Sequence, residues 1–245
     1  VALYRASLEA RLPFLSPERL AARMNAAGLD LFIDHGFGAT IGKYQALLSS
    51  VDPGRLVALH ATQDFLFGGE SREPSPAGFA ALQRQMSASK ARLCLGVMND
   101  GDGDRFVGGG RSAFLGMNRF GPLVVRYLSQ RLGLRGDVTR SLMTSHMADA
   151  ARARYAPGGV LHETKVGFQH LKAFIPTSLC SFEESDGMSP LGWSRDKDGL
   201  CAALFLVAMV LDEEQTPDEL DAVLTAELGR FDFERRKVEG RLAGE

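Results

Sequence analysis

Cysteine and long apolar runs are scarce in this sequence. Only three cysteines occur among 245 residues, and Cys94, Cys180 and Cys201 lie in apolar or helical surroundings. Such a small, odd number argues against a disulfide framework and indicates reduced thiols in a cytoplasmic protein. The longest apolar run, from Leu200 to Leu211, is about a dozen residues, which is too short to span a bilayer. We therefore expect a buried helix there, no membrane span and no signal peptide.

An excess of one charge is also absent. Lysine and arginine number 28 against 30 acidic residues, so the net charge is −2, and both signs are interspersed. A nucleic-acid-binding protein would carry a clustered basic surface, so we expect no nucleic-acid partner. The five histidines show no metal-ligand spacing. A small anionic ligand would therefore need local cations from lysine or arginine.

Length and the alternation of elements indicate the architecture. A chain of 245 residues with 45% apolar content is long enough for two compact units. Predicted strands and helices alternate, which points to a layered α/β architecture, and we place a domain boundary after residue 113, behind the glycine-rich segment 108–112. The expected strands cover residues 31–34, 55–60, 93–98, 138–143, 159–162 and 178–182.

Capping residues mark several helices. Ser16 and Pro17 start one that Gly28 ends, Asp198 precedes the apolar run, and the segment 216–219 reads as a capping box. Further helices are expected over residues 40–48, from Pro76 onward, over 118–132, from Thr144 or Ser145 to Tyr155, and up to Phe174.

Three carboxylates on alternate residues follow the predicted strand 93–98. The chain reads N-D-G-D-G-D-R-F from Asn99, so only glycines separate Asp100, Asp102 and Asp104. In an extended conformation alternate side chains share one face, where three ionised carboxylates repel one another. Three oxygen ligands on a short stretch suit a magnesium ion that keeps positions for phosphate or water, and the adjacent Arg105 suits an anion.

This loop has two other possible interpretations, a solvated turn and a calcium EF-hand. Aspartate and glycine are the commonest turn residues, so a solvated turn stays open. A calcium EF-hand needs glycine at its sixth position and glutamate at its twelfth, where this chain has Arg105 and Arg111. The calcium interpretation therefore fails.

Two further polar segments lie in the second half. Glu183 and Ser185 alternate at the end of the predicted strand 178–182, which suits the hydroxyl groups of a sugar, although an acidic surface loop would read the same. Arg195 and Lys197 precede a predicted helix and could bind an anion. Routine capping of that helix by Asp198 is the alternative explanation of this stretch.

The order of these segments is more specific than any one of them. D-G-D-G-D-R, E-T-K-V-G-F, F-E-E-S-D-G and R-D-K-D-G-L follow one another along the chain. In that order they resemble the phosphohexomutase family, and most of all its bacterial phosphoglucomutases. The resemblance covers nearly the whole chain and implies two tandem three-layer α/β domains with mixed sheets, the second and third of four. Residues 1–113 would bind metal, and residues 114–245 would recognise the sugar.

The resemblance also implies an activity and site residues. The family transfers a phosphoryl group between the C1 and C6 oxygens of a hexose phosphate, with Mg²⁺ and with glucose 1,6-bisphosphate as intermediate and activator. Asp100, Asp102 and Asp104 would be the metal ligands, Arg105 would lie beside the reacting phosphate, and Lys197 would take part in proton transfer. The expected substrate-binding residues are Glu183, Ser185, Thr164, Gly167 and Arg195.

The sequence also departs from the family pattern. Phe182 stands where the sugar loop commonly begins with glycine, and Asp186 adds negative charge near an anionic substrate, so sugar selectivity stays open. The family's phosphorylated serine loop and its distal phosphate clamp belong to the first and fourth domains and have no counterpart here. The stretch T-S-H-M at Thr144 lacks the Asn-Pro of the serine loop, and a helix cap explains Ser145.

Two functions follow from these observations. We expect the central fragment of a phosphoglucomutase-type enzyme, inactive alone because the nucleophile is missing, with the flanking domains of the same enzyme as its partners. The alternatives are a non-catalytic module that binds sugar phosphates and a phosphomannomutase of the same family. The enzyme fragment is favoured because the chain opens on Val1 rather than methionine, which suggests an excised segment.

Overall fold

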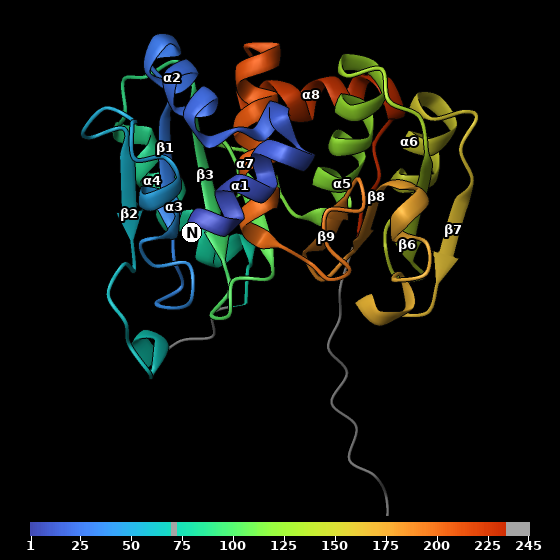
Figure 1. The fold of residues 1–245 in the computed structure, drawn as a ribbon, viewed down its shortest axis with the longest axis horizontal. Coiled ribbons are helices and arrows are strands. Elements are labelled where there is room, and N and C mark those ends of the chain that lie inside the picture. Colours follow the sequence, from blue (N-terminus) through green and yellow to red (C-terminus); the bar gives the residue numbers. More distant parts are fainter. Residues whose placement is uncertain (70–72, 234–245) are drawn as a thin grey trace, which may run out of the picture.

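Two mixed β-sheets organise the chain (Figure 1). The computed structural model describes residues 1–69 and 73–233. The first sheet has the strand order β2-β1-β3-β4-β5, and the second has the order β7-β6-β8-β9. The strands are β1 (Asp30–Asp34), β2 (Leu56–Leu59), β3 (Cys94–Asn99), β4 (Phe106–Gly109), β5 (Phe114–Leu115), β6 (Asp137–Ser141), β7 (Leu161–Thr164), β8 (Ser178–Glu183) and β9 (Gly187–Pro190).

Both sheets follow one topology. β1 lies between β2 and β3 and is parallel to both, while β4 runs antiparallel to β3. The strands β6, β7, β8 and β9 repeat this arrangement. The halves are therefore a structural repeat, although their sequences share only a rhythm of elements. In open α/β sheets, ligands bind at the carboxyl ends of parallel strands where the strand order reverses, and the loops after β3 and β8 follow such ends.

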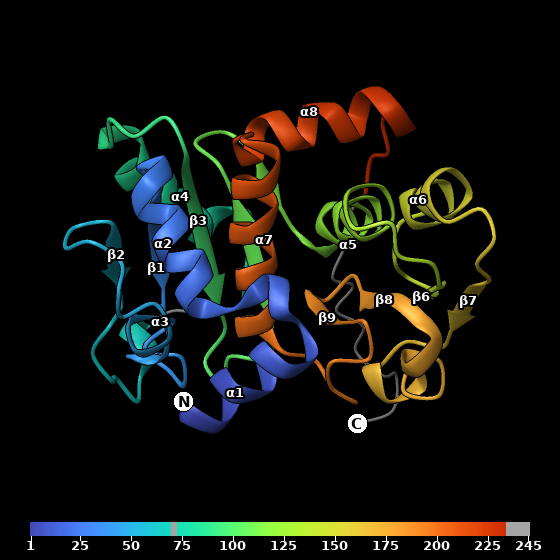
Figure 2. The ribbon, with the colours of Figure 1, turned by 45° about the horizontal axis from the view of Figure 1, so that its top comes forward.

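Helices cover these sheets in layers. α4 packs against β1 and β3, and α7 packs against β3 and β4 with α2 beside it (Figure 2). α5 packs against β8, and α6 packs against β6. The expected α/β fold with two mixed sheets is confirmed. The helices are α1 (Ala2–Arg11), α2 (Pro17–Ala27), α3 (Lys43–Leu47), α4 (Pro76–Ala88), α5 (Met117–Arg126), α6 (Met147–Tyr155), α7 (Gly199–Glu213) and α8 (Pro217–Leu228).

Alternation along the strands separates the two faces of the first sheet. Leu31 and Ile33 belong to a large core that includes Leu206 of α7, whereas Phe32 belongs to a smaller core with Phe79 of α4. Because successive strand residues point to opposite faces, this sheet is buried on both sides. The large core also contains residues of the second sheet, so apolar packing is continuous between the halves.

The apolar run predicted to form a buried helix is α7, which lies between the two sheets (Figure 1). Every residue from 201 to 211 is buried, since β3, β4, β9 and α2 surround the helix. A Cβ at Gly108 of β4 would lie only 2.4 Å from Leu206. A helix of the second half thus packs on the first sheet, and the domain boundary after residue 113 stays a prediction.

Two helices predicted from the sequence are shorter than expected or absent. The helix expected over residues 40–48 is confined to α3, because Gly42 takes a left-handed conformation (φ 72°) immediately before it. The prediction of a helix ending at Phe174 was wrong. Separate 3₁₀ turns, Phe168–His170 and Ile175–Thr177, lie there, with Pro176 inside the second turn. Proline has no backbone N–H, which limits helix continuation at this point.

Two further helices differ at their ends. The helix predicted over residues 118–132 begins at Met117 and becomes a π-helical segment from Tyr127 to Arg131. α6 begins only after His146. Ser145, one of its predicted caps, accepts a hydrogen bond from the backbone N–H of Met147 (3.2 Å).

The capping signals at α7 and α8 are confirmed. Asp198 accepts a hydrogen bond from a backbone N–H in the first turn of α7, and Thr216 and Glu219 form a reciprocal capping box. Asp198 also accepts hydrogen bonds from the hydroxyl of Tyr4 (2.8 Å) and the indole of Trp193 (2.7 Å). One carboxylate thus joins α1, the loop before α7 and α7 itself.

All three cysteines are buried free thiols. Burial raises the pKa of Cys94 to about 11, so this thiol stays protonated at neutral pH. No helix in the described ranges 1–69 and 73–233 is both long and apolar enough to cross a membrane.

The segment that joins β4 to β5 is held by one carboxylate of α8. Asp218 accepts hydrogen bonds from the backbone N–H groups of Arg111 (3.0 Å), Ser112 (2.9 Å) and Ala113 (2.6 Å). A Cβ at Gly110 would lie 1.9 Å from an oxygen of this carboxylate. The glycine-rich segment is therefore fastened to the C-terminal helix.

We expect Asp218→Ala to lower the free energy of unfolding by about 2 kcal/mol, because three hydrogen bonds to a charged acceptor are lost. Urea denaturation followed by circular dichroism measures this change. Asp232→Ala is the matched control, since the ion pair of Asp232 with Arg230 is exposed and should leave the midpoint unchanged. Equal denaturation midpoints for the two variants would show that Asp218 does not stabilise the segment between β4 and β5.

Candidate functional site

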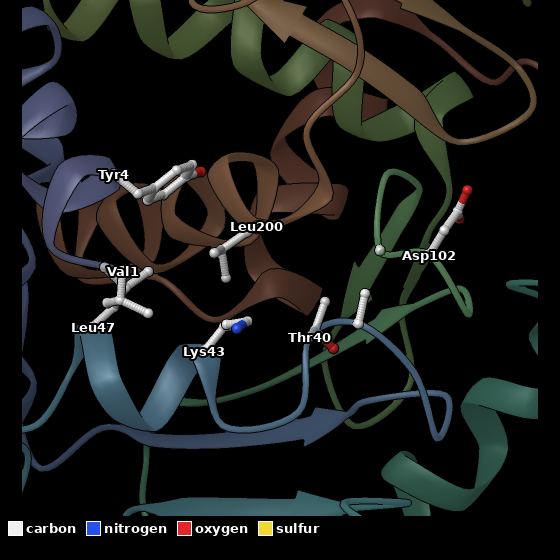
Figure 3. A pocket seen from close by; sticks show the side chains of 9 residues that line it. Val1, Tyr4, Thr40, Lys43, Leu47, Asp102 and Leu200 are labelled. Carbon is white, nitrogen blue, oxygen red and sulfur yellow. The ribbon is translucent and has the colours of Figure 1, made fainter. Parts of the chain in front are cut away.

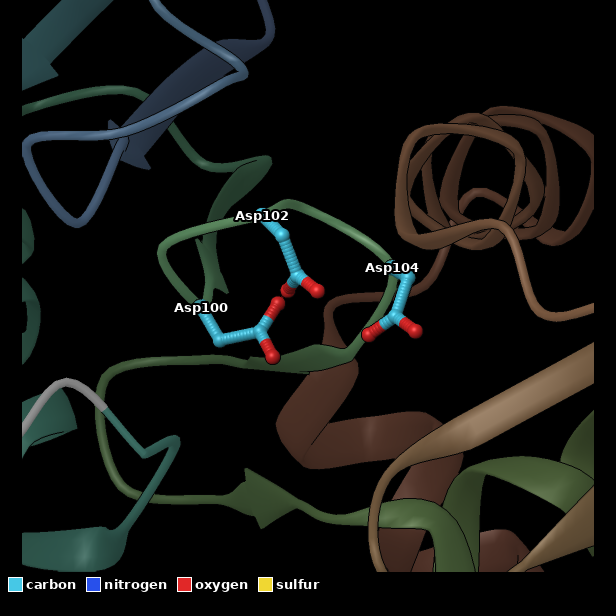
Figure 4. A group of neighbouring side chains, drawn as sticks. All are labelled: Asp100, Asp102 and Asp104. Atoms are coloured by element: carbon cyan, nitrogen blue, oxygen red, sulfur yellow. The ribbon is translucent and has the colours of Figure 1, made fainter.

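The three aspartates of the loop between β3 and β4 converge on one another (Figure 4). Carboxylate oxygens of Asp100, Asp102 and Asp104 lie within 4.8 Å of one another. Asp100 is 3% exposed, Asp104 is half-buried and Asp102 is exposed. The loop thus gathers three oxygens around one point, with Asp102 on the solvent side.

Asp100 also shapes the loop that contains it. One of its oxygens accepts hydrogen bonds from the backbone N–H groups of Gly103 (3.2 Å) and Arg105 (3.1 Å), and the other accepts one from Nε of Arg105 (2.5 Å). Asn99 donates to the carbonyl of Arg105 (2.8 Å) and accepts from the hydroxyl of Tyr44 (2.6 Å). These bonds close the loop, so its curvature is stabilised by its own residues.

Two other segments touch the backbone of this loop. The H-G-F-G segment after β1 comes so close that a Cβ at Gly38 would lie 2.0 Å from the carbonyl oxygen of Gly101, which also accepts the N–H of Ala39 (2.9 Å). At the start of α7, a Cβ at Gly199 would lie 2.4 Å from the side chain of Asn99. Both positions need glycine because no side chain fits between the backbones.

Electrostatic repulsion within the cluster favours a bound cation. The pKa of Asp104 is raised, first by burial and also by the charges of Asp100 and Asp102, while the ammonium of Lys197 acts in the opposite direction. A bound cation would relieve this repulsion. A proton competes for the same carboxylate, so cation binding should weaken as the pH falls toward the raised pKa of Asp104.

The donor set fits magnesium. Mg²⁺ prefers oxygen ligands and is usually held by carboxylates together with phosphate and water. Within the described part of the chain, Asp100, Asp102 and Asp104 are the one group of three potential metal-ligating side chains. The group contains neither histidine nor cysteine, the ligands typical of structural zinc sites. A hard, oxygen-preferring divalent cation is the best match.

Lys197 joins the carboxylate loop to the turn between β8 and β9. Its ammonium lies 3.5 Å from Oδ2 of Asp104 and 3.6 Å from Oε1 of Glu183. Its aliphatic stem passes over Gly187, where a Cβ would lie 2.4 Å from Cδ of Lys197. Three segments that the sequence analysis selected separately therefore meet at one cation.

The turn after β8 carries two further predicted site residues, Glu183 and Ser185. Glu183, at the end of β8, is 3% exposed, and a buried carboxylate needs a charged or hydrogen-bonded partner such as Lys197. Asp186 reverses the chain with φ 70°, and its carbonyl accepts a hydrogen bond from the N–H of Phe106 (2.9 Å). The turn is thus attached to the first residue of β4, directly behind the carboxylate loop.

The two residues that depart from the family pattern, Phe182 in β8 and Asp186 in the turn, have structural explanations. Phe182 is fully buried against α5, where a Cβ at Gly121 would lie 2.5 Å from its ring. Its side chain is therefore in the core. The carboxylate of Asp186 accepts a hydrogen bond from the N–H of Met117 (2.9 Å) at the start of α5, a position where negative charge is favourable.

Three predicted site residues lie apart from this centre. Thr164 ends β7, and its hydroxyl donates to the carbonyl of Lys165 (3.0 Å). Gly167 has φ 109°, a conformation that other residues rarely adopt, and Arg195 is exposed. The interactions among the described residues connect none of the three with the carboxylate loop or Glu183, so their roles stay predictions.

Ser145 has a local structural role. Its N–H donates to the side chain of Asn118 (2.8 Å), and its hydroxyl accepts the N–H of Met147 (3.2 Å) at the start of α6. This capping arrangement explains the T-S-H-M stretch without chemistry.

A pocket of about 280 Å³ opens beside the carboxylate loop (Figure 3). Thr40 and Lys43 line this pocket and were not predicted as site residues. A signal was present in the sequence, because both residues follow the H-G-F-G segment at the carboxyl end of β1. The carboxylate loop lies at the same edge of the sheet. The carboxylate of Asp102 points away from the other labelled side chains. The lining residues are Val1, Tyr4, Ala39, Thr40, Lys43, Leu47, Asp102, Gly103 and Leu200.

Known proteins resemble this chain in sequence or in fold. Phosphoglucomutase-like protein 5 of Mus musculus is 28% identical over 184 residues, which are 71% of this chain and 31% of that protein. The open form of pp63/parafusin, a phosphoglucomutase from Paramecium, is 22% identical with a TM-score of 0.73, and the match covers 94% of this chain and 42% of that chain.

A third similar structure was solved with ligands. N-acetylphosphoglucosamine mutase of Aspergillus fumigatus, in complex with GlcNAc-6P and magnesium, is 17% identical with a TM-score of 0.57, and the match covers 84% of this chain and 52% of that chain. At these identities the likeness to solved structures shows the fold alone. The present chain spans between 31% and 52% of the length of these three proteins.

Family models match both halves of the chain. The model of phosphoglucomutase/phosphomannomutase α/β/α domain II matches residues 14–108, and the model of domain III matches residues 117–227. The two matches follow each other in the expected order and leave only short segments of the chain uncovered. On this evidence, the chain belongs to the phosphoglucomutase/phosphomannomutase family.

Proposed function

We propose that this chain is the metal-binding and sugar-reading part of a phosphoglucomutase-type enzyme, which moves a phosphoryl group between the C1 and C6 oxygens of a hexose phosphate. The observation that carries the proposal is the position of Lys197 between Asp104 and Glu183. A carboxylate cluster suited to magnesium and a turn suited to sugar hydroxyls are thereby adjacent, as the transfer of a phosphoryl group to or from a sugar oxygen requires.

Each residue has a proposed role. Asp100, Asp102 and Asp104 would hold Mg²⁺, which when bound withdraws electron density from the transferring phosphoryl group. The guanidinium of Arg105 would bind a phosphate oxygen from its place beside Asp100. Lys197, which already faces Glu183, would give a proton to the sugar oxygen as the ammonium or take one from it as the neutral amine.

Sugar binding is proposed for the edge of the second sheet. Glu183 would accept and Ser185 would donate hydrogen bonds at the sugar hydroxyls, with Thr164 and Gly167 on the opposite side of the substrate. Arg195 is also proposed to bind the substrate. Glucose 1,6-bisphosphate would be the intermediate and activator. Glucose and mannose phosphates are both candidate substrates, since the proposed hydrogen bonds of Glu183 and Ser185 suit the hydroxyl groups of either epimer.

The proposed partners are flanking domains of the same enzyme. Ser145 is the serine most like the family's nucleophile, and its hydrogen bonds are those of a helix start. We therefore propose that the chain alone binds ligands but does not interconvert hexose phosphates. The three buried free thiols agree with a reducing, cytoplasmic location.

Magnesium binding is tested with Asp102→Asn. Titration calorimetry with MgCl₂ should show weak binding to the wild-type chain and tighter binding when inorganic phosphate is present. Asp102→Asn should abolish measurable binding, because one of three charged ligands is neutralised. The variant should fold as the wild type does, since this carboxylate is exposed. Asp232→Asn is the matched control and should bind as the wild type does. Undiminished binding by Asp102→Asn would refute the metal site.

Lys197→Met is expected to change cation affinity in the opposite direction. The ammonium repels a cation at the carboxylate cluster, so its removal should tighten Mg²⁺ binding by about threefold to tenfold in the same titration. Lys172→Met provides the control, because Lys172 pairs instead with the exposed Asp196. Weaker Mg²⁺ binding by Lys197→Met would show that the lysine acts on the cluster by another route.

Sugar recognition is tested with Glu183→Gln, which keeps the shape of the side chain. Affinity for glucose 1-phosphate should fall by about tenfold or more, since a charged acceptor is lost at a buried position. Calorimetry at saturating Mg²⁺ measures this affinity, and the Mg²⁺ affinity itself provides the control. An unchanged affinity for glucose 1-phosphate would exclude Glu183 from the sugar site.

A further inference from the structure

Two segments proposed to bind the sugar, the turn after β8 and the end of β7, meet at a buried serine. Ser141 is fully buried at the end of β6, the strand between them. Its Oγ lies 2.6 Å from Oε2 of Glu184 and 2.9 Å from Oγ1 of Thr144. Ser141 also pairs with Thr164 in the register of β6 and β7, and the next residue, Leu142, donates its N–H to the carbonyl of Thr164 (2.8 Å).

The direction of these hydrogen bonds follows from the chemistry of the groups. An ionised carboxylate only accepts, so Ser141 gives its single hydroxyl proton to Glu184 and accepts the proton of Thr144. A bond of 2.6 Å is typical of a hydroxyl that donates to a charged oxygen, and such bonds are stronger than neutral ones. The hydroxyl protons therefore have one arrangement, in which Thr144 donates to Ser141 and Ser141 donates to Glu184.

The turn after β8 is anchored at two of its residues. Glu184 is held by Ser141, and Asp186 is held through its carboxylate by the N–H of Met117. Glu183 precedes the first anchor, and Ser185 lies between the two. Their positions follow from these anchors, because a turn fixed at two residues has little freedom between them.

We propose that Ser141 and Glu184 are positioning residues of the sugar site. They hold the turn with Glu183 and Ser185 at a set distance from the segment that begins at Thr164, so that a hexose ring can be contacted from both sides. This inference rests on the proposed function. It gives Glu184 a structural task distinct from the sugar contact proposed for its neighbours.

The chain contains a matched control for Ser141. Ser181 is also a fully buried serine in the second sheet, on the neighbouring strand β8, and its Oγ has no hydrogen-bond partner among the described residues. Ser141→Ala and Ser181→Ala each remove one buried hydroxyl from the same sheet. Only the first removes bonds to Glu184 and Thr144, so the difference between the variants reports on positioning.

The test compares amide hydrogen exchange and ligand affinity in the 245-residue chain. In Ser141→Ala, the amides of residues 183–187 should exchange about tenfold faster, and glucose 1,6-bisphosphate should bind about fivefold to tenfold more weakly. Mg²⁺ affinity should stay at the wild-type value, because the carboxylate loop is closed by its own bonds. Ser181→Ala should match the wild type in all three measurements, and Ser141→Thr, which keeps the hydroxyl, should restore the first two.

A second pair of variants covers the case in which Ser141→Ala fails to fold. Glu184→Gln keeps an acceptor for Ser141 and should behave as the wild type, whereas Glu184→Ala should show the faster exchange and weaker binding. The proposal would be overturned if residues 183–187 exchanged equally fast in Glu184→Ala and Glu184→Gln. Equal exchange in Ser141→Ala and Ser181→Ala would overturn it as well. If the wild type binds no hexose phosphate, the proposed function fails, while the exchange rates still decide whether Ser141 and Glu184 fix the turn.

Discussion

Repulsion among three neighbouring carboxylates is the constraint around which the candidate site is built. Asp100 is stabilised by Arg105 and by backbone N–H groups of its own loop, and Asp104 is stabilised by Lys197. The same ammonium faces the buried Glu183. One lysine therefore balances charge on two segments from different sheets, the carboxylate loop and the turn after β8.

The fold provides the close approach that this charge balance needs. α7 packs on β3 and β4, and it begins with Gly199 against the carboxylate loop. The loop that precedes α7 carries Lys197, so the packing of the helix determines where the ammonium lies. Asp218 fastens the segment between β4 and β5 to α8, and the N–H of Phe106 binds the carbonyl of Asp186. Backbone contacts thus set the distances that the charged side chains use.

Much of the fold was predictable because its signals are local. Caps identified α7 and α8, and apolar runs identified the buried strands β1, β3 and β8. β4 and β9, which read F-V-G-G and G-M-S-P, are too short and too rich in small or helix-breaking residues for a periodic signal. The helix expected before Phe174 failed because Gly167 and Pro176 confine that stretch to 3₁₀ turns. The resemblance to the family implied two tandem domains with mixed sheets, but the order in which the strands pair was not predicted, since pairing order is not encoded by local periodicity.

The chemical types of the site residues and their order along the chain could be read from the sequence. Alternate aspartates separated by glycines put three carboxylates on one short loop, because their spacing is local. That their oxygens lie within 4.8 Å of one another depends on the hydrogen bonds that close the loop. The folded structure was needed to show that Lys197 lies near Asp104 and Glu183. It was also needed to show that Phe182 packs against α5, that Asp186 accepts a hydrogen bond at the start of α5, and that Ser141 holds Glu184. These contacts join residues far apart in the chain, and their distances depend on how two sheets pack around α7, which no spacing of residues specifies.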